Sequence, residues 1–139
     1  MTKRAKKSSR ARALPAQALV SVVDDDESVR ESLPDLLREL GFAAKAFASA
    51  GEFLMSDSLS TTRCLILDIT MPGMSGPELQ QELTARGHAI ATIFITARAD
   101  EILRQQLLAR GAVDCLFKPF SEQDLKAALD AALAANQGR

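Results

Sequence analysis

The chain has 139 residues, of which 47% are hydrophobic and 25% are charged, and its formal net charge is −1. These proportions are typical of one globular domain that buries its own core. No apolar stretch approaches the roughly 20 residues of a membrane-spanning helix, and the N-terminus lacks the apolar core of a secretory signal. We therefore expect a cytoplasmic protein that does not insert in a membrane and keeps its two cysteines, Cys64 and Cys115, reduced.

The near-zero net charge conceals an uneven distribution. Residues 1–17 contain six of the 17 basic residues and no acidic residue, so the remainder, with all 18 acidic residues, carries a formal charge of about −7. Basic segments can contact nucleic acid or anionic membranes, but they are also typical of solvated tails. We expect a disordered basic tail over 1–17, one domain over 18–135 and a short C-terminal tail over 136–139.

From residue 18 onwards, short apolar runs alternate with segments of helical spacing. The apolar runs, each of them an expected strand, lie at 18–23, 42–47, 64–68, 91–96 and 113–117. Aliphatic residues in the segments between them recur at the three- and four-residue steps of one helix face. The expected apolar faces consist of Val29, Leu33, Leu36, Leu37 and Leu40, then Leu79 and Leu83, then Ile102, Leu103, Leu107 and Leu108, and finally Leu125, Leu129 and Leu133.

Helix boundaries are also visible in the sequence. Ser49 and Ser75 are each followed three residues later by a glutamate, the capping-box pattern that begins a helix. Gly41 and Gly111 stand where helices are expected to end. Pro34 lies in the middle of the first helix, where it removes a backbone hydrogen bond. We expect this helix to bend at the proline, with the proline facing solvent.

Strands that alternate with helices predict right-handed βαβ units and a parallel sheet covered by helices on both faces. Five units in about 120 residues are typical of the α/β class, as a flavodoxin-like, doubly wound (βα)5 sandwich with strand order 2-1-3-4-5. In this order one strand separates those that carry Cys64 and Cys115. The separation is about 9–10 Å, which is too far for a disulfide.

Polar residues follow four of the apolar runs at their carboxyl ends. Asp24 and Asp25 follow the first strand, Asp68 the third, Thr96 the fourth and Lys118 the fifth. In open parallel sheets ligands bind at this edge. The same acids could instead cap the helix that follows them, a role that we expect for the next residue along the chain, Asp26.

The three carboxylates of Asp24, Asp25 and Asp68 are expected to converge between neighbouring strands. Like charges at close range raise one another's pKa or recruit a cation. Mg²⁺, or Mn²⁺ in its place, suits the cluster because it binds one or two carboxylates together with waters and phosphate oxygens. With Asp68 as nucleophile, Thr96 as hydroxyl donor and Lys118 as a point charge, the set suits phosphoryl transfer.

Four motifs resemble the receiver domain of bacterial two-component response regulators, and in particular its FixJ-type branch: VVDDDESVR, LILDITMPGMSGPEL, FITA and GAVDCLFKPF. The similarity runs from about residue 18 to 135. It implies that Asp68 is the phospho-acceptor, that Asp25 ligates Mg²⁺ directly and that Asp24 does so mostly through water. It also implies that Thr70 offers its backbone carbonyl to the metal.

The resemblance further implies a mechanism of signalling. A sensor histidine kinase or phosphotransfer protein donates the phosphoryl group, Lys118 contacts it, and the Lys118-Pro119 peptide bond is cis. Thr96 then moves toward the new phosphate, which changes a surface formed by the fourth helix, the fifth strand and the fifth helix. A downstream protein reads that surface. Such a domain is no turnover enzyme, since it assists only its own phosphorylation and dephosphorylation.

The sequence departs from the family pattern in two places. Cys115 stands where the family has a Tyr or Phe whose ring turns inward as Thr96 moves. FixJ-type regulators also carry a DNA-binding domain after the receiver, and this chain ends soon after its last expected helix. We therefore expect a single-domain response regulator without an output domain or direct DNA binding, present as a monomer or a phosphorylation-dependent dimer. The alternative is a non-switching pseudo-receiver for docking, or a phosphate relay or sink.

Two other classes of protein share part of the pattern. A flavodoxin-like FMN carrier has the same strand order, but the four acidic residues at 24–27 would repel the flavin phosphate. A haloacid-type phosphatase also places a nucleophilic aspartate after an apolar strand. It requires a second carboxylate two residues later, where this chain has Thr70.

Overall fold

The computed structural model describes residues 18–137. The predicted basic tail, 1–17, and the last two residues of the predicted C-terminal tail lie outside the described residues. Within the described range no helix is both long enough and apolar enough to cross a membrane.

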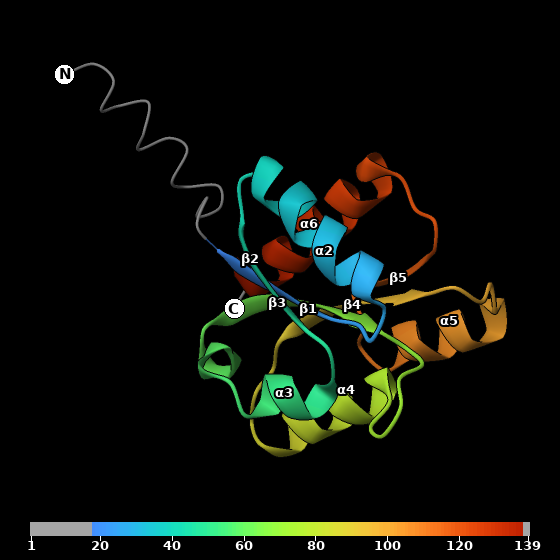
Figure 1. Ribbon diagram of the computed structural model, residues 1–139. Coiled ribbons are helices and arrows are strands. Elements are labelled where there is room, and N and C mark those ends of the chain that lie inside the picture. Colours follow the sequence, from blue (N-terminus) through green and yellow to red (C-terminus); the bar gives the residue numbers. More distant parts are fainter. Residues whose placement is uncertain (1–17, 138–139) are drawn as a thin grey trace.

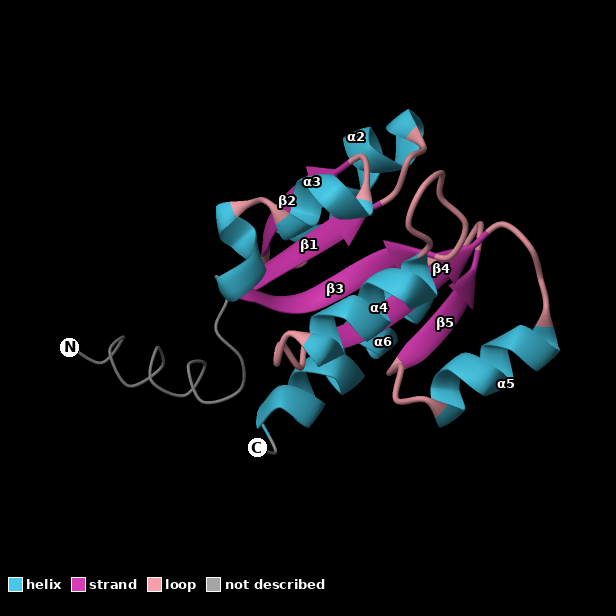
Figure 2. Cartoon of the chain, turned by 90° about the horizontal axis from the view of Figure 1, so that it is seen from below, coloured by secondary structure: helices cyan, strands magenta, loops and turns pink. Residues whose placement is uncertain are grey.

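The centre of the fold is one five-stranded sheet. Its strands run parallel in the order β2-β1-β3-β4-β5, as Figure 2 shows, so the predicted order is confirmed. β3 is the longest strand and lies in the middle. The strands are β1 (Leu19–Val23), β2 (Ala43–Phe47), β3 (Thr62–Asp68), β4 (Ala91–Thr96) and β5 (Asp114–Phe117).

Helices cover both faces of the sheet, which makes the molecule the predicted flavodoxin-like α/β sandwich (Figure 1). α2 and α6 lie on one face, and α3, α4 and α5 lie on the other. α6 continues two residues beyond the predicted domain boundary at 135. The helices are α2 (Glu27–Glu39), α3 (Ala50–Leu54), α4 (Gly76–Ala85), α5 (Glu101–Ala109) and α6 (Glu122–Gln137), with a 3-10 turn, η1, at Asp57–Ser60.

The sheet divides the hydrophobic core into two layers. Successive residues of a strand point to opposite faces, so Cys64 and Ile66 of β3 pack toward α2 and α6, while Leu65 and Leu67 pack toward α3, α4 and α5. Cys115 of β5 lies in the second layer, on the opposite face from Cys64. Both cysteines are free, as predicted, because they differ in face as well as in strand.

The predicted helix boundaries correspond to observed caps. The Ser75 hydroxyl accepts a hydrogen bond from the Glu78 N–H at 3.2 Å, and the Glu78 carboxylate accepts one from the Ser75 N–H at 2.9 Å, which completes the predicted capping box. Gly41 and Gly111 have φ angles of 101° and 108°, in the left-handed region that suits glycine after a helix. Asp26 caps α2 through Ser28, as predicted.

Two expectations about helix faces are wrong. Pro34 is buried beside Leu33 and Leu37 and does not face solvent. α2 buries a wide stripe against the sheet, and Pro34 shares an edge of that stripe with Leu37, three residues on. Ile102 was expected on the apolar face of its helix but is 73% exposed, because the i, i+4 pair Leu103 and Leu107 sets the direction of burial.

Gly76 opens α4 directly against the end of β3. Its N–H donates to the carbonyl of Ile69 at 2.9 Å, and a Cβ atom added at this position would collide with the backbone carbonyl of Asp68. α4 can therefore begin this close to β3 only with a glycine at its first position.

We expect Gly76→Ala to lower the free energy of unfolding by about 1–3 kcal/mol, because the backbone must shift to relieve the overlap. Gly51→Ala is the matched control, since a Cβ atom there would meet only the Ser49 hydroxyl, at 3.9 Å. This control should change the free energy of unfolding by less than about 1 kcal/mol. Urea unfolding followed by circular dichroism measures both variants, and equal stabilities would contradict the close approach.

Candidate functional site

Four strands bring polar residues to the same edge of the sheet. Asp24 directly follows β1, Asp68 ends β3, Thr96 ends β4 and Lys118 directly follows β5. β1 pairs with β3, β3 with β4 and β4 with β5 in parallel register, so these residues lie at adjoining strand ends. The structure therefore brings together the residues that the sequence predicted at this edge.

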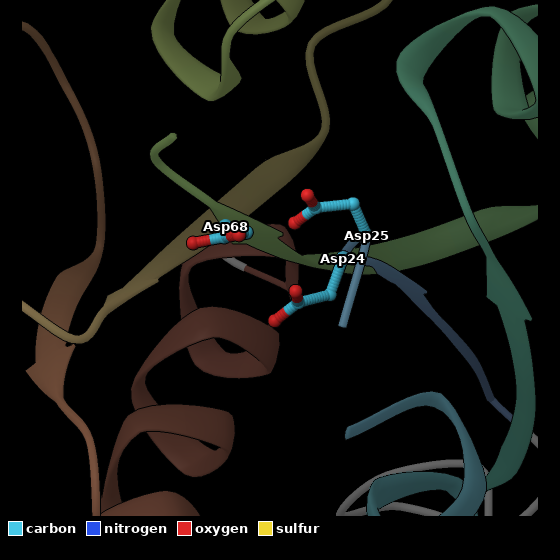
Figure 3. Close-up of side chains that lie close together, drawn as sticks. All are labelled: Asp24, Asp25 and Asp68. Atoms are coloured by element: carbon cyan, nitrogen blue, oxygen red, sulfur yellow. The ribbon is translucent and has the colours of Figure 1, made fainter. Parts of the chain in front are cut away.

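The three aspartates form one acidic cluster (Figure 3). Each of Asp24, Asp25 and Asp68 offers a carboxylate oxygen, and these oxygens lie within 4.8 Å of one another. Asp24 and Asp68 are buried, whereas Asp25 is exposed to solvent. Burial, reinforced by the charge of Asp24, raises the pKa of Asp68 to about 7, against the opposing effect of the Lys118 ammonium.

Lys118 supplies positive charge to the cluster. Its Nζ lies 2.9 Å from Oδ2 of Asp24 and 4.0 Å from Oδ1 of Asp68, so in this structure its closer partner is Asp24. The other carboxylate oxygen of Asp24 accepts the N–H of Asp26 at 2.9 Å. Asp24 is thus held from both sides, and Lys118 points into the site.

Sequence reasoning missed one residue of this site, Arg30. Its Nη1 donates to the backbone carbonyl of Asp24 at 3.1 Å, from one turn inside α2. An arginine shortly after four acidic residues was the available signal, but an exposed helical arginine gives the same sequence pattern. Only the packing of α2 against β1 brings the guanidinium to the Asp24 carbonyl.

Thr96 is buried at the end of β4, next to the strand that carries Asp68. Its hydroxyl accepts the N–H of Arg98 at 3.1 Å, and its carbonyl accepts the N–H of Lys118 at 2.7 Å. Thr96 is therefore bonded both to the loop that leads into α5 and to the lysine of the site. Its role as a switch stays a prediction.

The remaining predicted positions lie around the cluster or away from it. Thr70 is exposed two residues beyond Asp68, and its role as a carbonyl ligand stays a prediction. The Lys118-Pro119 peptide bond is cis, as the resemblance implies. Cys115 belongs to the core on the α5 side and not to the acidic cluster, and burial raises the pKa of its thiol. The predicted role of Cys115 in switching also stays a prediction.

The donor set of the cluster suits a small, hard cation. All of its ligand atoms are carboxylate oxygens, and two of the three carboxylates are buried. Within the described residues, Lys118 is the cation that lies within ion-pair distance of both buried carboxylates. Mg²⁺ favours such oxygen ligands and retains several waters, for which the exposed Asp25 side leaves access. The cluster can therefore hold a divalent metal ion.

Residues 20–130 match the family model of the response regulator receiver domain, and the chain belongs to this family. Among curated relatives it is 43% identical over 118 residues to the transcriptional regulatory protein TdiR of Thauera aromatica, covering 85% of this chain and 52% of TdiR. It is 41% identical over 128 residues to the transcriptional regulatory protein FixJ of Azorhizobium caulinodans, covering 91% of this chain and 61% of FixJ.

Solved structures agree in fold. The response regulator StyR superposes with a TM-score of 0.79 at 45% identity, over 87% of this chain and 61% of StyR. The structure described as FixJ-N superposes with a TM-score of 0.75 at 36% identity, over 85% of this chain and 94% of that one. The chain spans little more than half the length of the curated relatives it matches.

The raised pKa of Asp68, about 7, makes the stability of the metal-free protein depend on pH. The native state keeps a proton that the unfolded chain, with the ordinary value of 3.8, releases. The contribution of protonated Asp68 is therefore full below about pH 4 and is lost as the pH rises through about 7. The full change in pKa corresponds to about 4 kcal/mol. Because solvent screens the site, we expect the free energy of unfolding of the wild type, relative to Asp68→Asn, to fall by about 2 kcal/mol over this range. Urea unfolding of both proteins in the presence of a chelator measures this difference. A difference in free energy of unfolding that stays constant with pH would contradict the raised pKa of Asp68.

Proposed function

We propose that Asp68 accepts a phosphoryl group from a phosphohistidine of a sensor histidine kinase or phosphotransfer protein, as the signal-receiving step of a cytoplasmic two-component system. The observation that carries this proposal is the meeting of Asp24, Asp25 and Asp68 with Lys118 at one edge of the sheet. The membership of this chain in the receiver domain family supports the same proposal.

The metal in this proposal is Mg²⁺, or Mn²⁺ in its place. Asp24, Asp25 and Asp68 would hold it, together with the backbone carbonyl of Thr70. When bound, the ion supplies positive charge that offsets the carboxylates and the phosphoryl oxygens during transfer. The close approach of three carboxylate oxygens supports this assignment.

In the transfer step, a carboxylate oxygen of Asp68 attacks the phosphorus atom and forms a new P–O bond. The P–N bond of the phosphohistidine breaks, and its electron pair stays on the imidazole nitrogen. Asp68 must be ionised to attack. Because its pKa is raised to about 7, about half of the metal-free protein carries an ionised Asp68 at neutral pH. Lys118, 4.0 Å from Asp68, is positioned to contact an oxygen of the transferred group as a point charge.

The modified aspartate then shifts an equilibrium between two conformations. In the unmodified state the Thr96 hydroxyl is engaged with the N–H of Arg98. A phosphoryl oxygen on Asp68 would accept a hydrogen bond from the Thr96 O–H. Thr96 then turns toward the phosphoryl group, its hydroxyl oxygen no longer accepts the Arg98 N–H, and the loop at 97–100 loses a contact. The surface of α5, β5 and α6 changes as a result, and a downstream protein or a second copy of the chain reads it.

Incubation with acetyl phosphate and Mg²⁺ tests the acceptor. We expect the wild-type protein to gain the mass of one phosphoryl group, because a small donor can replace the kinase. Asp68→Asn should gain none, and chelation of the metal should abolish the gain in the wild type. Intact-mass spectrometry measures each sample. An equal gain in the wild type and in Asp68→Asn would place the acceptor elsewhere.

A second test concerns the lysine of the site. Lys118→Gln removes the cation that faces Asp24 and Asp68, and we expect it to slow phosphorylation by acetyl phosphate about 10²-fold, the usual effect of removing one charge-stabilising donor. Lys126→Gln is the matched control, since Lys126 pairs with the exposed Asp130 on α6. Initial rates of mass gain compare the two variants, and similar rates would argue against a role for Lys118 in the transfer.

A further inference from the structure

α5 is held to the rest of the molecule by little apolar burial. Leu107 is its one buried side chain, and Leu103 and Leu108 are partly buried. α6 contributes a much larger set to its face of the core: Leu125, Ala128, Leu129, Ala132 and Leu133. Because apolar burial is the main force that holds a helix on a sheet, α5 can be displaced at a lower cost than α6.

Polar contacts from Arg104 compensate for this light packing. Nε of Arg104 donates to the backbone carbonyl of Cys115 at 3.2 Å, and Nη2 lies 3.4 Å from Oδ1 of Asp114, so one side chain of α5 contacts β5 twice. Nη1 contacts Glu101 of its own helix at 3.2 Å. The side chain is 30% exposed, which leaves the guanidinium partly shielded from water.

The contacts converge on the backbone of Cys115. Its carbonyl accepts from Arg104, and its N–H donates to Oδ1 of Asp114 at 2.7 Å. β5 is an edge strand, so these side chains satisfy groups that no further strand pairs. Cys115 itself is buried on the α5 side of the sheet, and its short side chain offers no ring that could turn between two positions.

α5 and β5 are also connected to the Asp68 site, through Thr96. The Thr96 hydroxyl accepts a hydrogen bond from the N–H of Arg98, in the loop that enters α5, and the Thr96 carbonyl accepts one from the N–H of Lys118, directly after β5. Thr96 therefore contacts both the loop that enters α5 and the residue that follows β5, and Arg104 joins the same two elements further along.

We propose that Arg104 couples the Asp68 site to the α5–β5 surface, as a positioning residue that holds α5 on β5 while Asp68 is unmodified. The inference rests on the proposed function. When Thr96 leaves the N–H of Arg98 for the phosphoryl group, the loop at 97–100 shifts, and Arg104 releases the Cys115 carbonyl and Asp114. In this chain, the guanidinium thus takes the place of a rotating ring at position 115.

The experiment compares Arg104→Gln with Arg110→Gln in the full chain. Arg110 is the C-cap of the same helix, is exposed, and its side chain makes no hydrogen bond or ion pair among residues 18–137. Its substitution by glutamine therefore changes the charge of α5 without breaking a hydrogen bond or ion pair. The chain has no Trp or Tyr, so amide exchange and intact mass are the readouts. Each protein is measured before and after treatment with acetyl phosphate and Mg²⁺.

Before treatment, we expect α5 amides of Arg104→Gln to exchange about tenfold faster than those of the wild type, because charge-assisted hydrogen bonds to β5 are lost. Arg110→Gln should match the wild type. After treatment, α5 exchange should rise in the wild type and in Arg110→Gln but change little further in Arg104→Gln. Arg104→Lys, which retains the charge without the two-pronged geometry, should fall between them. Each of the four proteins should still gain the mass of one phosphoryl group.

Two results would overturn the inference. One is equal α5 exchange in untreated Arg104→Gln and Arg110→Gln, and the other is a phosphorylation-induced rise in Arg104→Gln as large as in the wild type. Both would occur with normal mass gain at Asp68. A wild-type protein that gains no mass would instead overturn the proposed function, and the coupling with it.

Discussion

The site depends on an imbalance of charge that the topology itself creates. Strand order 2-1-3-4-5 places β1 beside β3, so the carboxylates of Asp24 and Asp68 are buried against each other at the same strand ends. Within the described residues, Lys118 is the cation that lies within ion-pair distance of both. One ammonium cannot offset three neighbouring carboxylates. The pKa of Asp68 is raised mainly because the carboxyl group is buried, and the charge of Asp24 adds to the effect of burial.

The deficit is one of charge and not of hydrogen bonding. Every buried side-chain nitrogen and oxygen in the described part of the chain has a hydrogen-bond partner. The buried Ser21 and Thr62 hydroxyls, for example, bond to each other across β1 and β3 at 2.7 Å. Elsewhere the fold therefore satisfies its polar groups, and the acidic cluster stands out as the place where additional positive charge would be stabilising. A site with these properties favours the binding of a cation, and then of an anionic group that contacts the same cation.

Much of this could be predicted from the sequence because the relevant signals are local. Each strand is a short apolar run, each polar site residue directly follows such a run, and parallel order alone brings those ends together. The same holds for Ser75, whose capping partner is three residues away. These inferences need no knowledge of which helix packs against which strand.

The features that sequence reasoning missed are those that depend on packing between distant segments. Pro34 is buried because α2 packs a wide stripe of its surface against the sheet. Ile102 is exposed because Leu103 and Leu107 are the residues of α5 that point into the core. The contacts of Arg30 and Arg104 with backbone carbonyls likewise depend on where α2 and α5 lie. A long arginine side chain can reach in many directions, so its sequence position does not determine its partner.

The side chains that cover Cys115 also restrict how another protein can bind at β5. An edge strand ordinarily offers unpaired N–H and C=O groups on which an incoming strand can extend the sheet. At Cys115, Asp114 and Arg104 already occupy both groups. While these contacts persist, a partner that approaches this edge must recognise side chains and not backbone, which protects the sheet from indiscriminate strand addition and leaves selectivity to the surfaces of the neighbouring helices.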